Sequence, residues 1–243
     1  MQMDQTEFHD LFTNALQRNN LEPLAAEQIH SFYRFTEHLL TVNEHTNLTA
    51  IRDIPSIIDK HYVDSLLISR FLPIGARVLD LGCGPGFPSI PLAIARPDLT
   101  IVALDSTAKK IAFVQESAQL LQINNLGAVS GRAEDGAIRK QLKTFDFVVS
   151  RAVARLNILC ELCLPYLKVG GSLLALKGAR FQEEADEAKH AIKILGGDTT
   201  GIDNTSLVTQ DGEEIRATIM VKLLKTPPPQ YPRAYAAILK KPL

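Results

Sequence analysis

The strongest indication of ligand binding in the sequence is a glycine-rich loop that follows an apolar run ending at Leu81. Its sequence over 82–86 is GCGPG, and the carboxylate of Asp80 stands just before it. Glycine permits a tight turn and lets a ligand approach the backbone without an intervening side chain. The dinucleotide fingerprint G-x-G-x-x-G does not fit, because Phe87 or Ser89 would stand at its third glycine. The loop therefore predicts a backbone cradle for a ligand other than a dinucleotide.

An acidic residue at a strand end followed by G-x-G-x-G resembles motif I of the class I methyltransferases, whose cofactor is S-adenosylmethionine. On this resemblance Gly82, Gly84 and Gly86 hold a cofactor that has no phosphate to cradle. Asp105 ends the next apolar run, where a carboxylate can accept hydrogen bonds from both hydroxyls of a ribose. We therefore expect Asp105 to bind the ribose of this cofactor.

Ala133 and Glu134 follow the third apolar run, where class I methyltransferases often place a residue against the adenine ring. We expect both residues to contact the cofactor. The alternative for Glu134 and Asp135 is a helix N-cap, in which a side-chain oxygen accepts from free backbone amides. Cys83 lies in the glycine loop with no general base beside it in the sequence, so we interpret it as a small packing residue.

The segment after the fourth apolar run, where class I methyltransferases act, reads SRA over 150–152. It lacks both the Asn/Asp-Pro-Pro-aromatic motif of exocyclic-amine enzymes and the nucleophilic Pro-Cys pair of C5-cytosine enzymes. Cys160 and Cys163 lie on an apolar helix and fit a core better than a zinc site, so we expect no metal. A ring nitrogen with a free lone pair, such as guanine N7, fits this segment, since it loses no proton and needs mainly proximity and orientation. Arg151 is the candidate catalytic residue and a further cofactor contact, and its alternative role is an ion pair with a nearby carboxylate.

Alternating strand and helix patterns surround these residues and predict an α/β fold. The expected strands are 76–81, 100–105, 127–130, 145–150 and 172–176. The expected helices between them are near 88–96, 107–122, 135–142, 156–167 and 180–195. Short apolar strands separated by amphipathic helices indicate a parallel sheet covered on both faces. Because Asp211-Gly212 between 202–209 and 214–224 predicts a hairpin, we expect a Rossmann-like, mostly parallel seven-stranded sheet with a C-terminal β-hairpin.

Helical patterns precede the sheet, and a basic segment follows it. Apolar residues at helical spacing over 4–18 and 24–45, followed by two more helical segments near 54–71, predict an N-terminal helical cap. The expected domain boundaries are 1–72 for this cap, 73–226 for the S-adenosylmethionine-binding Rossmann-like domain and 227–243 for a basic C-terminal tail.

The composition of the 243 residues is that of an ordinary globular protein, with 46% hydrophobic residues and a net charge of −1. No apolar run reaches the roughly 18 residues that a membrane-spanning helix needs, so we expect no membrane association. The first ten residues are acidic and do not resemble a signal peptide. Three cysteines do not make a disulfide framework, and we expect a cytoplasmic protein.

The charge is unevenly distributed along the chain. Residues 1–60 carry nine acidic and four basic groups, whereas residues 215–243 carry six basic groups and no acidic one. This asymmetry predicts that the C-terminal end meets a polyanion, and RNA contacts are expected at Lys222, Lys225, Arg233, Lys240 and Lys241. The prolines over 227–229 predict an extended segment that projects from the sheet. The alternative is that Tyr231 packs on the sheet edge and the lysines are merely solvated.

Taken together, these motifs resemble the bacterial small-subunit rRNA guanine-N7 methyltransferase G family, also called the glucose-inhibited division protein B family. The resemblance covers nearly the whole length. It is carried by NLT at 47–49, HYVDSL at 61–66, the loop 82–88, LDS at 104–106, SRA at 150–152, LKG at 176–178, YPR at 231–233 and KKPL at 240–243.

The family resemblance implies transfer of a methyl group from S-adenosylmethionine to N7 of a guanine in 16S ribosomal RNA. The cofactor contacts that it implies are Gly82, Phe87, Ala133, Glu134 and Arg151. The chain departs from the family pattern at Ser89, where many relatives have glycine, and at 234–237, where AYAA replaces a more basic stretch that contains glycine.

Two other functions stay open at this point. One is a methyltransferase of the same fold that acts on a small molecule or a protein, and the other is a non-catalytic rRNA-binding assembly factor. The expected partner is small-subunit ribosomal RNA or a ribosomal particle, and we expect the chain to act as a monomer.

Overall fold

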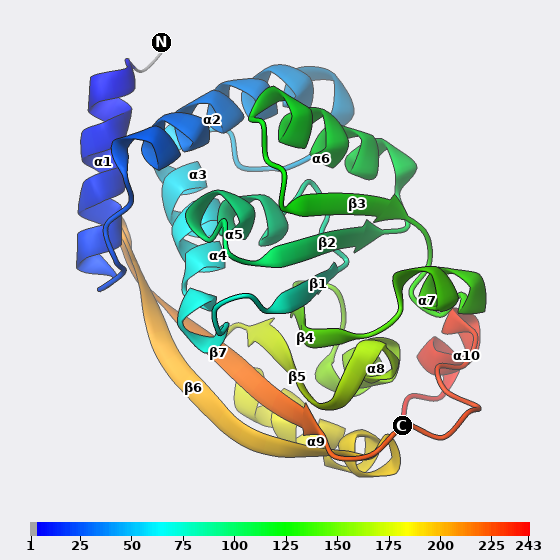
Figure 1. Cartoon of the computed structure of the whole chain (residues 1–243). Coiled ribbons are helices and arrows are strands. Elements are labelled where there is room, and N and C mark those ends of the chain that lie inside the picture. Colours follow the sequence, from blue (N-terminus) through cyan, green and yellow to red (C-terminus); the bar gives the residue numbers. More distant parts are fainter. Residues whose placement is uncertain (1–3) are drawn as a thin grey trace.

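The computed structural model describes residues 4–243, so residues 1–3 of the predicted cap lie outside the described part (Figure 1). A seven-stranded sheet in the order β3-β2-β1-β4-β5-β7-β6 forms its centre. The strands are β1 (Arg77–Leu81), β2 (Thr100–Asp105), β3 (Leu126–Ser130), β4 (Phe145–Arg151), β5 (Leu167–Lys177), β6 (Gly197–Thr209) and β7 (Gly212–Leu223). Strands β1 to β5 run parallel, whereas β7 pairs antiparallel with both of its neighbours. The predicted mostly parallel sheet with a C-terminal hairpin is confirmed.

Strands β5 and β6 both begin earlier than the apolar pattern indicated. The early part of β5, Lys168–Gly170, is exposed, and so is the segment Asp198–Thr200 of β6. An exposed strand needs no alternation of apolar and polar residues, because neither of its faces has to enter a core. Backbone pairing across the sheet, which a sequence pattern does not record, therefore sets these two boundaries.

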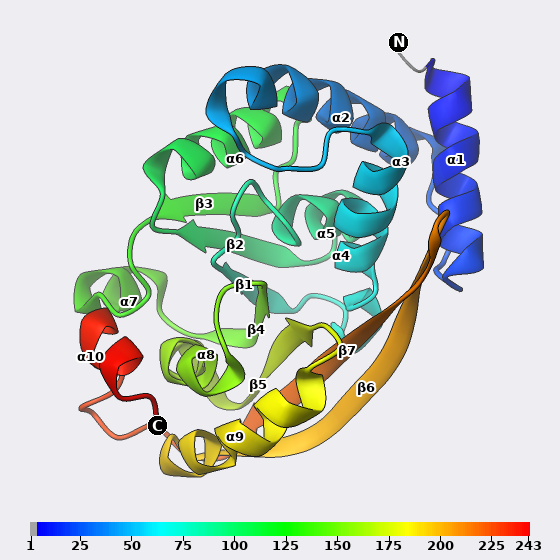
Figure 2. The ribbon, with the colours of Figure 1, turned by 180° about the vertical axis from the view of Figure 1, so that it is seen from behind.

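Helices cover both faces of the sheet, as Figures 1 and 2 show. On one face, α5 (Ser89–Ala95) and α6 (Ala108–Leu120) share a core with the cap. On the other face the helices are α7 (Gly136–Leu142), α8 (Leu156–Cys163), the 3₁₀ turn η3 (Leu164–Tyr166) and α9 (Phe181–Ile194). Val78 enters the first core and its neighbour Leu79 the second, since successive side chains of a strand point to opposite faces.

The cap begins with α1 (Gln5–Arg18) and α2 (Ala26–Thr46), which pack through aromatic side chains. Phe12 and Tyr62 both contact Phe32, with ring centroids 4.8 and 4.9 Å apart. The Tyr62 hydroxyl finds a buried partner in the Thr36 hydroxyl at 2.7 Å. Among residues 4–243, no helix has both the length and the apolar character needed to cross a membrane.

The third part of the cap is helical, but it is broken into short pieces. It comprises α3 (Ile54–Ile57), the π-helical turn η1 (Ile58–Val63), α4 (Asp64–Leu66) and the 3₁₀ turn η2 (Ser69–Phe71). π-Helical turns are rare and occur often at functional sites. Here the turn carries three consecutive polar residues, Asp59, Lys60 and His61.

The far end of the β6–β7 hairpin reaches across to the cap, which Figure 2 shows clearly. Arg18 donates from Nε to the Val208 carbonyl at 2.9 Å and also pairs with the buried carboxylate of Asp59. Asp59 accepts a second hydrogen bond from the Gln210 amide at 3.1 Å. The hairpin tip thus binds both α1 and the π-turn, and these bonds fix the cap to the β6–β7 hairpin.

The prediction that the C-terminal segment projects from the sheet is wrong. The chain turns back after β7 and ends in α10 (Tyr235–Lys240), which lies beside α7 in both views. The Arg233 guanidinium donates to Glu161 of α8 at 2.8 and 2.6 Å, and the Arg233 amide donates to the same carboxylate at 2.9 Å. Ile238 is fully buried. Glu161 is also fully buried, and a buried carboxylate needs a cation, which Arg233 supplies. Counting charges along the sequence did not reveal that Glu161 is the partner of Arg233.

We expect Arg233→Ala to destabilise the fold, because it leaves the buried Glu161 carboxylate without its cation. Removing one partner of a buried pair costs about 3–5 kcal/mol, and the partial exposure of Arg233 places this case near 3 kcal/mol. Urea unfolding measures the effect, with the exposed tail residue Lys241→Ala as the control. Equal stability of the two variants would contradict a structural role for Arg233.

Candidate functional site

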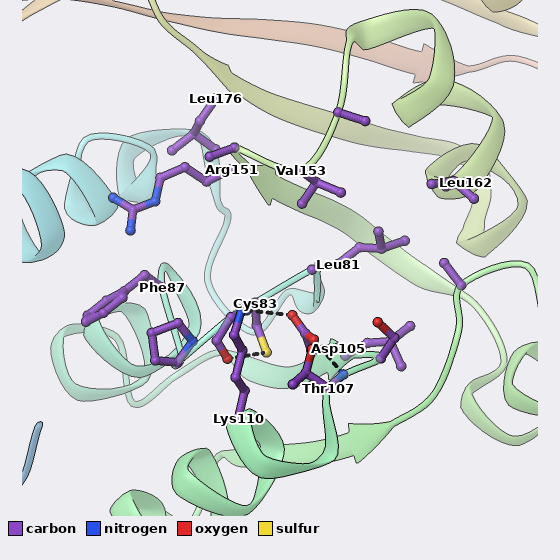
Figure 3. Close-up of a pocket in the computed structure, with 18 of the residues that line it drawn as sticks. Leu81, Cys83, Phe87, Asp105, Thr107, Lys110, Arg151, Val153, Leu162 and Leu176 are labelled. Atoms are coloured by element: carbon purple, nitrogen blue, oxygen red, sulfur yellow. Dashed lines mark hydrogen bonds between the residues drawn. The ribbon is translucent and has the colours of Figure 1, made fainter. Parts of the chain in front are cut away.

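A cavity of about 1060 Å³ opens at the carboxyl ends of the parallel strands, where open α/β sheets bind their ligands (Figure 3). The predicted residues that line it are Gly82, Gly84, Phe87, Asp105, Ala133, Glu134 and Arg151. Gly86 does not line it. An ideal Cβ on Gly86 would lie 2.5 Å from Cδ1 of Ile90, so this glycine permits the close packing of α5.

The glycine loop runs between β1 and α5 in a conformation that favours glycine. Gly82 and Gly84 have φ angles of +77° and +55°. At Gly84 nothing lies within 4 Å of an ideal Cβ, so the missing side chain leaves open space at the cavity wall. At Gly82 the Cβ would come within 2.3 Å of Val153 Cγ2, so the missing side chain there admits a neighbouring loop. The backbone at Gly84 is therefore open to a ligand, whereas Val153 covers the backbone at Gly82.

Asp105 at the end of β2 fastens this loop. Its Oδ2 accepts from the Gly84 amide at 3.0 Å, and its Oδ1 accepts from the Thr107 amide at 2.8 Å. An ionised carboxylate has about four acceptor positions, so each oxygen keeps one for a ligand hydroxyl. The two backbone bonds fix the direction in which these free positions point.

Asp80, the acidic residue of the motif, lies beneath the loop and is fully buried. Its Oδ2 accepts from the Ser89 amide at 2.9 Å, and this bond ties the end of β1 to the start of α5. Burial raises the pKa of Asp80 to about 7. Ser89, whose amide makes this bond, is fully buried as well. Asp80 thus shapes the loop from within and does not line the cavity.

Arg151 at the end of β4 reaches across the cavity to the cap. Its Nη1 donates to Asp64 Oδ2 at 2.8 Å and to the Lys60 carbonyl at 2.9 Å, so the ion pair considered for it in the sequence exists. Its guanidinium carbon lies 5.5 Å from the centroid of the Phe87 ring. Figure 3 shows Arg151 and Phe87 on the same side of the cavity.

Asp64 also accepts from a second arginine that the sequence did not point to. Arg216 of β7 donates from Nε to Asp64 Oδ1 at 2.8 Å and from Nη2 to Glu214 at 2.9 Å. Glu214 in turn pairs with Lys60 at 2.8 Å. Three of the four, Asp64, Lys60 and Arg216, line the cavity. No local pattern could join the two pairs, because Lys60 and Asp64 belong to the cap, whereas Glu214 and Arg216 belong to β7.

His61 of the π-turn packs against Phe87. Its ring stacks on the Phe87 ring with centroids 4.3 Å apart and an angle of 16° between the planes. Its Nε2 lies 2.8 Å from the Thr49 hydroxyl. Burial and the positive charge of Arg151 lower the pKa of His61 to about 4, so the imidazole is neutral at pH 7. We interpret His61 as a fixed wall of the site.

The cysteines do not provide a nucleophile. Cys83 lines the cavity, but burial raises the pKa of its thiol well above the usual value. Cys160 and Cys163 are fully buried in the core of α8, and burial raises the pKa of Cys160 to about 12. Since the thiolate is the reactive form, all three cysteines are unreactive at neutral pH.

The predicted RNA contacts are spread over different parts of the molecule. Lys222 pairs with Ser172 in the middle of β5, whereas Lys177 at the end of β5 lines the cavity. Lys222, and Lys225 after it, therefore lie toward the opposite end of the sheet. Lys240 and Lys241 are exposed at the end of α10. Three cations that line the cavity, Lys110, Arg132 and Arg180, were not singled out by the sequence.

Comparison with known proteins identifies the family. Residues 28–210 match the family described as rRNA small subunit methyltransferase G. The chain belongs to this family. Proteins named ribosomal RNA small subunit methyltransferase G are similar over nearly the full length. The one from Lactobacillus delbrueckii subsp. bulgaricus is 40% identical, with 96% of this chain and 99% of that protein covered. The one from Brevibacillus brevis is 41% identical over 94% and 95%.

Solved structures support the fold of this methyltransferase G family member. The crystal structure of P. horikoshii TYW2 in complex with MeSAdo gives a TM-score of 0.54 at 14% identity, covering 67% of this chain and 62% of that one. M. jannaschii TYW2 in complex with AdoMet gives the same TM-score and identity, covering 66% and 75%. At this identity the likeness concerns the fold alone.

The two glycines of the loop predict different responses to the same substitution. Gly84→Ala should cost about 1 kcal/mol, the price of a left-handed conformation for an alanine. Gly82→Ala carries a similar cost and in addition displaces Val153, which adds about 1–3 kcal/mol. Urea unfolding measures both.

The double variant Gly82→Ala/Val153→Ala isolates the contact with Val153, because the remaining Cβ of residue 153 is 3.4 Å from the new methyl group. It should recover most of the extra loss. No recovery would show that Val153 does not close over Gly82.

Proposed function

We propose that this chain transfers a methyl group from S-adenosylmethionine to N7 of a guanine in small-subunit ribosomal RNA. The observation that carries the proposal is the cavity at the carboxyl ends of the strands, where a bare glycine loop and Asp105 face Arg151. Membership of the methyltransferase G family supports the same reaction and the same kind of substrate. We further propose that the protein works in the cytoplasm as a monomer.

The residues of the cavity fit the proposed cofactor. The backbone at Gly82 and Gly84 receives its amino acid end. At Gly84 nothing lies within 4 Å of an ideal Cβ, whereas at Gly82 Val153 closes one side of the backbone. The two oxygens of Asp105 are directed by their backbone bonds and can each accept from a ribose hydroxyl. Ala133 and Glu134 line the cavity at the end of β3 and receive the adenine. When bound, S-adenosylmethionine supplies a methyl group on a positively charged sulfur.

Guanine N7 is the target atom that these side chains favour. It carries a lone pair and no proton, so the reaction needs neither a nucleophile nor a general base from the protein. The protein accordingly offers no reactive thiol, because burial raises the pKa of Cys83, Cys160 and Cys163. The imidazole of His61 is likewise not placed to act as a general base, because it lies between Thr49 and Phe87. The protein contributes orientation, which can account for a large part of a rate enhancement.

Arg151 is the residue that we propose to orient the target base. Asp64 and the Lys60 carbonyl both bind its Nη1. Within residues 4–243 no side chain or carbonyl binds its Nε or Nη2, so these donors remain for the substrate. Guanine presents O6 next to N7, and arginine donors pair well with these acceptors. A hydrogen bond from Arg151 to O6 would hold N7 toward the methyl donor without blocking its lone pair.

The decisive experiment is transfer of labelled methyl from S-adenosylmethionine to naked rRNA, to small-subunit particles and to total protein, measured side by side. We expect label in RNA only, and nucleoside analysis should identify N7-methylguanosine. Label in protein would assign the chain to another methyltransferase function. Binding of RNA without any transfer would make it an assembly factor.

Asp105→Ala should weaken S-adenosylmethionine binding by about 1.5–3 kcal/mol, the range for hydrogen bonds to a charged group. Asp105→Asn should lose less, since the amide oxygen can still accept one of these bonds. Calorimetry measures both variants, with the surface carboxylate Asp186 replaced by alanine as the control. Unchanged affinity in a folded Asp105→Ala protein would show that the ribose is held elsewhere.

The cations best placed to contact the RNA backbone are those around the cavity, namely Lys110, Arg132 and Arg180. Lys240 at the end of α10 and Lys241 after it add to them. Arg180→Ala should then reduce the log–log salt slope of RNA binding by about 0.7–0.9, the effect of one lost phosphate contact. Lys225→Ala at the other end of the sheet is the matched control and should leave the slope unchanged. The reverse result would favour a path along the end of β7.

A further inference from the structure

The loop that follows β4 forms one wall of the cavity and has an unusual backbone. It runs from Ala152 to Arg155, and all four residues line the cavity. Ala152 has a φ angle of +56°, a left-handed conformation that a residue with a side chain adopts only when its surroundings hold it there. Val153, the next residue, lies against Gly82 of the glycine loop. The position of this loop thus determines how wide the cavity is between Arg151 and the glycine loop.

A lysine and a glutamate from two other elements hold this loop by its backbone. Lys177 at the end of β5 donates from Nζ to the Ala154 carbonyl at 2.6 Å. The same Nζ lies 2.7 Å from Oε2 of Glu184 on α9. That carboxylate oxygen accepts from the Leu156 amide at 3.0 Å. One ion pair therefore binds the backbone at two points, the carbonyl of Ala154 in the loop and the amide of Leu156 at the start of α8.

The burial of this pair sets it apart from the other ionic contact of the loop. The side chains of Lys177 and Glu184 are only 8% and 18% exposed. Arg155 also bonds to α9, through Glu183 and Glu187, but these three side chains are between 41% and 54% exposed. Exposed pairs contribute little to stability because water and salt screen them. The shielded pair is consequently the contact that can fix the loop.

We propose that Lys177 and Glu184 are positioning residues, which set the height of the Ala152–Arg155 loop above the glycine loop and so the distance between the target base and the methyl donor. The proposal rests on the proposed methyl transfer. Neither residue needs to touch the reacting atoms, since their backbone bonds act on Ala154 and Leu156. Orientation in the cavity is expected to dominate catalysis, and a displacement of about 1 Å can cost about a hundredfold in rate.

Lys177→Met tests this role, because it keeps the length of the side chain and removes its charge and its donors. We expect kcat for rRNA methylation to fall about 10- to 100-fold, while the Kd for S-adenosylmethionine changes less than about threefold. Lys177→Arg should restore kcat to within about fivefold, since a guanidinium can reach both the Ala154 carbonyl and Glu184. The control is Lys189→Met, which breaks the exposed pair of Lys189 with Asp186 on the same helix and should change neither value.

A second measurement does not depend on turnover. Amide hydrogen exchange over 152–156 in the protein alone should become faster in Lys177→Met and stay as in the wild type in Lys189→Met. If Lys177→Met unfolds, the double variant Lys177→Met/Glu184→Gln, which leaves no unpaired charge, takes its place in both measurements.

Unchanged kcat with unchanged exchange would overturn the proposal, and so would a loss of cofactor affinity as large as the loss of kcat. A wild-type protein that methylates no RNA would instead refute the proposed function. In that case faster exchange over 152–156 in the variant would still support the positioning of the loop, and unchanged exchange would reject it.

Discussion

The carboxylate of Asp64 lies between two guanidinium groups, and the arrangement of the whole site depends on this contact. Arg151 approaches it from β4 and Arg216 from β7, each at 2.8 Å, while Asp64 itself belongs to the cap. The carboxylate is only 8% exposed, so it requires both cations, and each cation is held in one direction by it. Three parts of the chain thereby meet at the rim of the cavity. The cap is consequently a part of the site and not an appendage to the sheet.

The two sides of the cavity are held by side chains of different length, which come from different elements. On the glycine side, Asp105 and Asp80 accept from backbone amides of the loop and of α5, so the backbone is fixed directly to the ends of the strands. On the opposite side, long side chains reach the loop after β4 from β5 and α9. The aspartates that hold the first wall come from the strands that carry the glycine loop and its neighbour. The second wall is held by longer side chains from β5 and α9, which lie outside the wall itself.

Much of this could be predicted from the sequence, and the exceptions share a cause. The glycine loop, Asp105 and Arg151 lie at the carboxyl ends of strands, and the apolar pattern located the carboxyl ends of β1 to β5 to within one residue. Arg216 was missed because it is one charged residue on an exposed part of a strand, and only the pairing of β7 with β5 brings it to Asp64. The tail was misjudged for the same reason. Its positive charge was evident, but the buried Glu161 that pairs with Arg233 lies on a helix whose neighbours the sequence does not reveal.

The contact of the hairpin tip with the cap has a consequence for how the chain folds as it is synthesised. Arg18 and Val208, which share a hydrogen bond, are 190 positions apart, and Asp64 and Arg216 are 152 apart. The first helices leave the ribosome long before their partners exist, so the cap cannot reach its final position until β7 is complete. Contacts of such high sequence separation are formed late and slow the folding reaction. Until the hairpin is made, the buried carboxylate of Asp64 therefore lacks one of its two cations, and that of Asp59 lacks the Gln210 amide.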